Sequence, residues 1–169
     1  QLDDWSVALM ALRSFLPRNE GSSKLLAPLV KTMQAWSKSG QTLSPLVFRG
    51  LGGAIALPKW RQIDDSDLPD RRGGFVSSRS EPTTFDTATA AICFQQALGR
   101  LKVSGDENAA TRKRILRARQ FCGQMLYRSR EAYWTAKPEK MIGAIRVSPS
   151  SASVSLVSCA AAIEAFCLE

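Results

Sequence analysis

The chain has 169 residues, of which 44% are hydrophobic and 22% charged, and this balance is typical of a globular domain with a substantial core. Its formal net charge is +8, and it contains no apolar run near the roughly 18 residues of a membrane-spanning helix. The absence of histidine and of any Cys-x-x-Cys pair excludes a Cys/His zinc site built from this chain alone, and we expect no metal and no cofactor.

Two helices are predicted in the first quarter of the chain. Residues 3–16 are apolar on nearly every side, as in a buried helix, and Pro17 ends them. Ser22 or Ser23 caps the second helix, which runs to about Ser39 and carries a single apolar stripe. Pro28 lies inside the second helix, so it either kinks this helix or delays its start.

Residues 41–83 are predicted to form a long irregular connection, because glycines and prolines interrupt them repeatedly. Asp64, Asp65 and Asp67 cluster within this connection. They fit a metal or diphosphate site, but a turn capped by aspartate side chains is the favoured interpretation, since Pro69 argues against a helix that presents all three.

Three further helices are predicted downstream. Residues 84–98 form a second helix that is apolar almost all round, and Gly99 is its expected end. A long amphipathic helix starts at Asp106 or Asn108 and reaches about Arg130, with its arginines on the outer face. After an irregular connection over residues 131–151, residues 153–166 form a third helix that is apolar almost throughout.

The predicted helices alternate between buried and amphipathic, which favours an all-α fold with an inner and an outer layer. We expect all four cysteines in the core as reduced thiols, because each lies among apolar residues at helical positions. They are Cys93, Cys122, Cys159 and Cys167. The chain does not begin with Met and stops inside a predicted helix, so we expect it to be a piece of a longer protein.

A basic run on the long amphipathic helix provides much of the positive charge. It consists of Arg112, Lys113, Arg114, Arg117 and Arg119. Such a run attracts nucleic acid or anionic lipid in some proteins, but a solvated outer helix face is the favoured interpretation. No aromatic residues interleave with the run, which argues against nucleic acid.

The chain uses one design twice. Residues 72–96 align with residues 142–166 at a constant offset of 70 and without a gap. Each copy predicts a glycine-marked turn, a short extended piece, a polar loop and a helix rich in small residues. The aligned positions are Gly73 with Gly143, Phe75 with Ile145, Ser78 with Ser148, and Ala90–Ala91–Ile92 with Ala160–Ala161–Ala162. Self-similarity of this kind indicates a repeat architecture.

Several short segments carry a resemblance to a known family. QLDDWSVA at residues 1–8 is similar to a D-x-D-D-T-A motif, and VKTMQ at residues 30–34 is similar to half of a glutamine–tryptophan repeat. DSDLP at residues 65–69, EPTTFD at residues 81–86 and GAIR at residues 143–146 are similar to a loop, a helix start and a closing repeat. Together they resemble the terpenoid-cyclase and prenyltransferase α/α-toroid group, most specifically the squalene–hopene cyclases.

The resemblance implies that residues 1–169 form a single α/α-toroid segment, an incomplete ring of about five long helices with long connecting loops. It further implies that Asp3 is a general acid that protonates an alkene, with Asp4 beside it. Trp5 and Phe85 would offer aromatic faces to a carbocation, and Asp86 would face the inner cavity. Helix capping is the competing interpretation of Asp3 and Asp4, and a favourable first-turn carboxylate that of Asp86.

Two functions follow as hypotheses. In the first, a squalene–hopene-cyclase-like toroid binds an isoprenoid or another hydrophobic small molecule at its apolar inner surface, and catalyses cyclisation only if Asp3 works as an acid. In the alternative, a non-enzymatic helical-repeat scaffold binds a protein partner or a second copy of itself along open edges. A weaker third option is peripheral contact of the basic run with lipid headgroups or nucleic acid.

Overall fold

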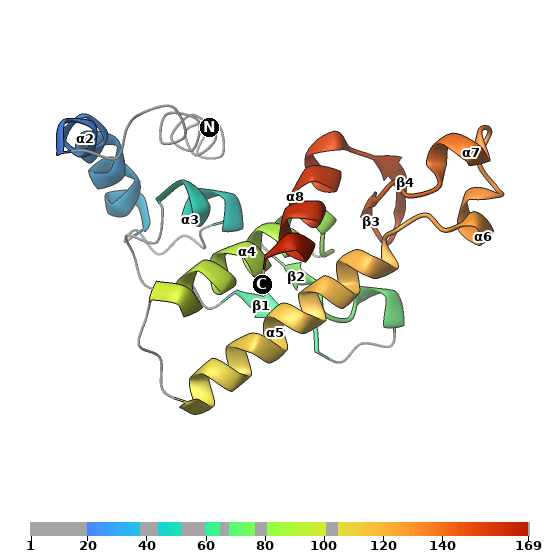
Figure 1. Cartoon of the computed structure of the whole chain (residues 1–169), viewed down its shortest axis with the longest axis horizontal. Coiled ribbons are helices and arrows are strands. Elements are labelled where there is room, and N and C mark those ends of the chain that lie inside the picture. The colour runs from blue at the N-terminus through green and yellow to red at the C-terminus, as the bar shows by residue number, and fades with distance from the viewer. Residues whose placement is uncertain are drawn as a thin grey trace. The chain divides into compact units, whose positions relative to one another are not determined.

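The computed structural model of the chain describes residues 20–37, 44–51, 60–64, 68–76, 81–100 and 105–168. The chain divides into two compact units, Gln1–Lys59 and Trp60–Glu169. The structure is mostly helical with a few short strands, which confirms the all-α class (Figure 1). Among the described ranges, no helix combines the length and the apolarity needed to cross a membrane. The helix predicted over residues 3–16 lies outside the described residues, and the single-segment assignment stays a prediction.

The first unit contains helix α2 (Glu20–Ser37), which contacts helix α3 (Pro45–Leu51). Helix α2 starts two residues before the predicted cap and continues through Pro28. The Thr32 hydroxyl donates a 3.0 Å hydrogen bond to the carbonyl oxygen of Pro28. Pro28 therefore does not delay the start of α2.

Helix α3 was not predicted, because its seven residues lie within the stretch interpreted as irregular. Ser44 caps its start, since the Ser44 hydroxyl accepts a 3.3 Å hydrogen bond from the Val47 N–H. Pro45 occupies the first helical position, where the missing N–H costs nothing. Residues 45–48 are buried, so the Ser-Pro pair marks a real helix start that the interpretation of residues 41–83 as irregular missed.

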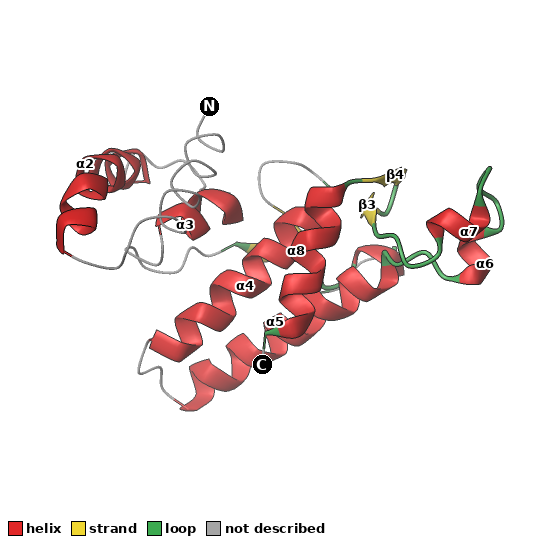
Figure 2. Cartoon of the chain, turned by 45° about the horizontal axis from the view of Figure 1, so that its top comes forward, coloured by secondary structure: helices red, strands yellow, loops and turns green. Residues whose placement is uncertain are grey.

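The second unit is built around three long helices, α4 (Thr84–Arg100), α5 (Gly105–Gln124) and α8 (Leu156–Cys167). Helix α4 packs against both α5 and α8, and Figures 1 and 2 show the three lying side by side. Short strands β1 (Arg61–Gln62) and β2 (Phe75–Val76) pair antiparallel, with the 3-10 turn η1 (Pro69–Arg71) between them. Helices α6 (Ser129–Ala132) and α7 (Pro138–Met141) precede the antiparallel pair β3 (Arg146–Ser148) and β4 (Ser151–Val154).

Helix α4 is the core element, as its apolar pattern predicts. Residues 87–94 are all buried, and small side chains such as Ala88, Ala90 and Ala91 allow its neighbours to approach closely. The helix continues through Gly99 to Arg100, so the expected end at Gly99 is wrong by one residue. The Thr84 hydroxyl donates a 2.6 Å hydrogen bond to the carbonyl oxygen of Arg146, which joins the start of α4 to strand β3.

Helix α5 buries the predicted stripe but ends earlier than predicted, at Gln124 instead of about Arg130. Backbone pairing with a distant segment accounts for this end. The Tyr127 N–H donates to the carbonyl of Ala144 at 2.8 Å, and the Arg146 N–H donates to the carbonyl of Met125 at 2.9 Å. Because these groups pair across the chain, residues after Gln124 become extended.

The predicted internal repeat is confirmed in the backbone. Gly73 and Gly143 both have left-handed φ angles, 85° and 86°. In each copy the glycine N–H donates to a preceding extended residue, whose own N–H donates back to the residue after the glycine. These sets are Gly73 and Gly74 with Ile63, and Gly143 and Ala144 with Tyr127. A buried apolar residue follows at the same step in both copies, and α4 and α8 are the helices that follow.

Helix α8 contradicts the prediction of a helix buried on nearly every side. Its small residues face the core, namely Ser158, Ala161, Ala162 and Ala165. Its large apolar side chains are exposed instead, namely Leu156, Val157, Ile163 and Phe166. The helix also begins three residues later than predicted, because Ser153 and Val154 belong to β4. The sequence pattern correctly showed that α8 is apolar on most of its surface. Burial also requires neighbouring elements, and among the described residues α8 packs against α4 and α5 through its small side chains.

Candidate functional site

The residues that the cyclase resemblance singles out divide between the undescribed and the described parts of the chain. Asp3, Asp4 and Trp5 lie outside the described residues, so their roles stay predictions. Phe85 and Asp86 lie in the first turn of α4, and both are half-buried. The structure therefore describes two of the five candidate residues, and both lie at one helix start.

The start of α4 is capped by Thr83. The Thr83 hydroxyl accepts a 3.0 Å hydrogen bond from the Asp86 N–H, and the Thr83 carbonyl accepts one from the Thr87 N–H. Asp86 is an acidic residue in the first turn, where the helix dipole favours negative charge. The position of Asp86 therefore fits the interpretation of a favourable first-turn carboxylate.

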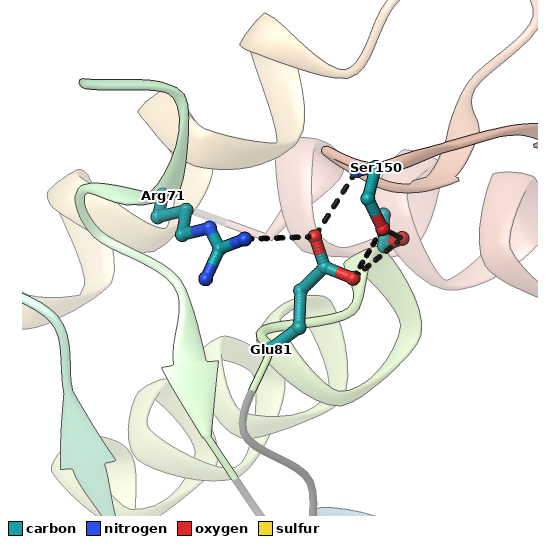
Figure 3. Close-up of polar contacts among 4 residues, drawn as sticks. Arg71, Glu81 and Ser150 are labelled. Carbon is teal, nitrogen blue, oxygen red and sulfur yellow. Dashed lines mark hydrogen bonds and ion pairs between the residues drawn. The ribbon is translucent and has the colours of Figure 1, made fainter. Parts of the chain in front are cut away.

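A polar clasp joins the two repeat copies, and it consists of Glu81, Arg71, Ser148 and Ser150 (Figure 3). The Glu81 carboxylate accepts hydrogen bonds from the hydroxyl and the backbone N–H of Ser150, and another from the Ser148 hydroxyl at 3.3 Å. Arg71 lies on its other side as an ion-pair partner at 3.7 Å. Glu81 precedes α4, whereas Ser148 and Ser150 belong to the β3–β4 turn, so the clasp fixes the second copy against the first.

The chemistry of the clasp is that of a structural contact. The Ser150 hydrogen bonds, opposed by partial burial and helped by the charge of Arg71, hold the pKa of Glu81 below its ordinary value. A carboxylate with a lowered pKa is a weak general base, and the chain contains no histidine to activate a serine. The clasp therefore joins the two copies and does not form a nucleophilic site.

A half-buried arginine packs against the aromatic residues of the core. The Arg114 guanidinium lies 4.5 Å from the ring centre of Phe94 and 5.2 Å from that of Phe75. It also donates a 2.6 Å hydrogen bond to the carbonyl oxygen of Trp60, whose ring meets Phe94 edge-on. Burial lowers the pKa of Arg114, and the nearby Asp64 charge opposes this shift. The protein's own cation thus occupies aromatic faces that a ligand cation would need.

Sequence reasoning placed Arg114 on the outer face of its helix, together with the rest of the basic run. That placement is wrong for three members. Arg117 pairs with Asp64, and the Arg119 guanidinium donates to the carbonyl of Leu168. The helical spacing could have predicted the inward position of Arg114, because Arg114 lies four residues before buried Ala118 and seven before buried Phe121, on the same face of α5. Arg112 and Lys113 are exposed, as predicted.

An open cleft of about 300 Å³ lies beside α5 and the Gly73 turn. Its lining consists of Asp64, Arg72, Gly73, Arg117, Gln120 and Gln124. Every side chain in this lining is polar or charged, and the Asp64–Arg117 pair crosses it. The cleft suits water or a small polar molecule and has no apolar wall for an isoprenoid. Asp64 is therefore an arginine partner, and Asp65 and Asp67 lie outside the described residues.

The cysteines follow the core prediction in part. Cys93 and Cys122 are buried, and burial raises the pKa of the Cys122 thiol to about 12. Cys159 is half-buried and Cys167 is exposed, so the prediction of four core thiols is wrong for Cys167. Within the described ranges, no group of three or more acidic, cysteine or histidine side chains could hold a metal ion.

Comparison with known proteins gives no relative: no family model, no curated protein and no solved structure matches the chain. The candidate site must therefore be judged from its own geometry.

Proposed function

We propose that the chain is a non-enzymatic helical-repeat scaffold of the α/α-toroid type, which assembles through the exposed face of α8. The observation that carries this proposal is the contrast between the two repeat-equivalent helices. Residues 87–94 of α4 are all buried, whereas α8 leaves four large apolar side chains in solvent. An exposed apolar helix face of this size marks an interaction surface.

We call this face the α8 edge: Leu156, Val157, Ala160, Ile163 and Phe166, all of them exposed. Spacings of three and four residues place them along one side of the helix. None of the five carries a charge, and the half-buried Glu164 lies beside them, four residues after Ala160. In the repeat, the neighbour that α8 already has is α4, a helix of the same design.

The α8 edge suits a second copy of itself. Ala160 lies near its middle, with two large side chains before it and two after it. An antiparallel second α8 that crosses at Ala160 places Val157 opposite the partner's Ile163, and the small residue allows close approach. The large side chains are arranged alike before and after Ala160, so two antiparallel copies of the α8 edge are complementary, as a two-fold symmetric interface requires.

Self-association tests the proposal by light scattering across a range of protein concentrations. The Ile163→Asp variant should weaken dimer formation by more than about tenfold, because it places a charge in the contact. Leu116→Asp on α5 is the matched control, since Leu116 is 56% exposed and Ile163 58%. A monomeric wild type, or a dimer that Ile163→Asp leaves intact, overturns the proposal.

A second experiment tests the geometry. Ala160→Cys is introduced with Cys159 and Cys167 replaced by serine, and the protein is oxidised. Crossing at Ala160 should give a disulfide-linked dimer, because two cysteines bridge when their Cα atoms are about 4.4–6.8 Å apart. Cysteine in place of Leu116 in the same background should stay monomeric. Equal cross-linking of both variants counts against the crossing.

The cyclase-like function remains a second candidate, supported by the toroid-like repeat of turn, strand and helix around Gly73 and Gly143. It requires Asp3 as the acid and a hydrophobic ligand near Trp5 and Phe85. Incubation with squalene, and comparison of the wild type with Asp3→Asn, tests it. Equal product from both proteins removes the acid role of Asp3.

A further inference from the structure

The segment 128–142 between α5 and β3 carries the most exposed aromatic pair in the described residues, Tyr133 at 73% and Trp134 at 86%. Their rings lie 5.6 Å apart and nearly perpendicular. Figures 1 and 2 show α6 and α7 projecting beyond the ends of the three long helices. We call this segment the aromatic tip.

The aromatic tip is held by its own hydrogen bonds. The Glu131 carboxylate accepts a 3.1 Å hydrogen bond from the backbone N–H of Arg128, the residue that precedes α6. The hydroxyl and the N–H of Thr135 both donate to the carbonyl of Ala132, which is fully buried. Tyr133 and Trp134 are therefore presented to solvent by a folded turn.

The same segment carries four exposed cations: Arg128, Arg130, Lys137 and Lys140. They outnumber the two carboxylates of the segment, Glu131 and Glu139, and Glu131 accepts the Arg128 N–H. Ile142, which is also exposed, adds an apolar side chain. The aromatic tip thus combines two amphipathic aromatic side chains, an exposed aliphatic side chain and an excess of positive charge.

We propose that the aromatic tip docks on an anionic lipid surface. Tyr and Trp favour the headgroup level of a bilayer, where an apolar ring and a polar N–H or O–H are both satisfied. Exposed lysines and arginines beside them attract anionic headgroups. The site differs from the α8 edge, so the proposal does not depend on assembly of the scaffold.

Nucleic acid fits the aromatic tip less well. Single strands bind in grooves where parallel aromatic faces receive successive bases. Here the two rings are nearly perpendicular, at 83°, and they belong to the segment whose helices α6 and α7 project in Figure 1. Two exposed aromatic side chains with exposed cations in the same segment suit insertion at an anionic lipid interface.

Vesicle flotation tests the proposal with the full chain. Vesicles of phosphatidylcholine with 30% phosphatidylserine should retain the protein at 0.1 M salt, and pure phosphatidylcholine vesicles should retain about tenfold less. Trp134→Ala and the double variant Lys137→Glu/Lys140→Glu should each lower binding about tenfold. Lys113→Glu, a charge reversal at an exposed site on α5, should change it less than about twofold.

Equal binding of the protein to neutral and anionic vesicles would overturn the proposal. So would loss of vesicle binding in Lys113→Glu but not in the double variant. A protein that binds polyuridylate through Trp134 and does not bind vesicles would also overturn it. Circular dichroism of each variant confirms that α-helix content is kept. Ile163→Asp should still float with anionic vesicles, so a failure of scaffold assembly and a failure of lipid docking give different results.

Discussion

A Cβ atom on Gly73 would overlap the carbonyl oxygen of Arg117, whereas one on Gly143 would meet no atom within 4 Å. The two glycines share a left-handed φ and the same backbone hydrogen bonds, but only the first turn is pressed against α5. The repeat copies thus have the same conformation and different surroundings.

This difference predicts unequal costs for the same substitution. Gly143→Ala should lower the free energy of unfolding by about 1 kcal/mol, the cost of a left-handed alanine. Gly73→Ala should lower it by about 3 kcal/mol or more, because the methyl group also displaces α5. Urea denaturation measures both, and equal losses would contradict the close contact with Arg117.

Arg114 is predicted to stabilise the core as a cation. Arg114→Met should lower the free energy of unfolding by about 2 kcal/mol, since it removes the contacts to Phe75 and Phe94 and leaves the Trp60 carbonyl without its donor. Lys113→Met, one residue away and exposed, should change it by less than about 0.5 kcal/mol. Thermal or urea unfolding compares the two, and a neutral Arg114→Met would refute the stabilising role.

Two buried threonines on α4 are predicted to respond in opposite directions. The Thr87 hydroxyl accepts a 3.0 Å hydrogen bond from the Phe75 N–H, so Thr87→Val leaves a buried donor unpaired and should cost about 1–3 kcal/mol. The Thr89 hydroxyl is buried and has no hydrogen-bond partner among the described residues. Thr89→Val should therefore keep or raise the stability. Losses of the same size in urea unfolding would contradict the assignment.

The Glu81 clasp predicts a pH dependence of stability. The pKa of Glu81 in the folded protein lies below its ordinary value of 4.5, so its contribution is present above pH 4.5 and is lost as pH falls through the folded-state pKa. Glu81→Gln should lower stability at pH 7 by about 1 kcal/mol, discounted for partial exposure.

The same variant should approach the wild type as pH falls from 4.5 through the folded-state pKa of Glu81, because the wild-type carboxylate is protonated over this range, first in the unfolded and then in the folded protein. Urea midpoints between pH 3 and pH 7 measure the convergence. A constant gap between Glu81→Gln and the wild type at all pH values would exclude the linkage.

The hydrophobic pattern of the sequence was sufficient to predict the buried residues of helices α4 and α5. The apolar run over residues 84–98 predicted a core helix, and the amphipathic pattern predicted that α5 has one buried face, which contains Ile115, Ala118 and Phe121. The repeat offset predicted that Gly73 and Gly143 are equivalent, because only glycine adopts a left-handed turn at little cost. The candidate acid at Asp3 rested on a motif whose residues lie outside the described part.

The sequence by itself determined the helical class, the backbone repeat and the residues of the α4 core, since propensity and periodicity are properties of neighbours along the chain. Tertiary structure decided three further matters: that α5 ends where Tyr127 pairs with Ala144, that Arg114 turns inward onto Phe94, and that α8 keeps an open apolar face. Each depends on residues distant in sequence, and the pattern of one segment does not contain the partner that covers it.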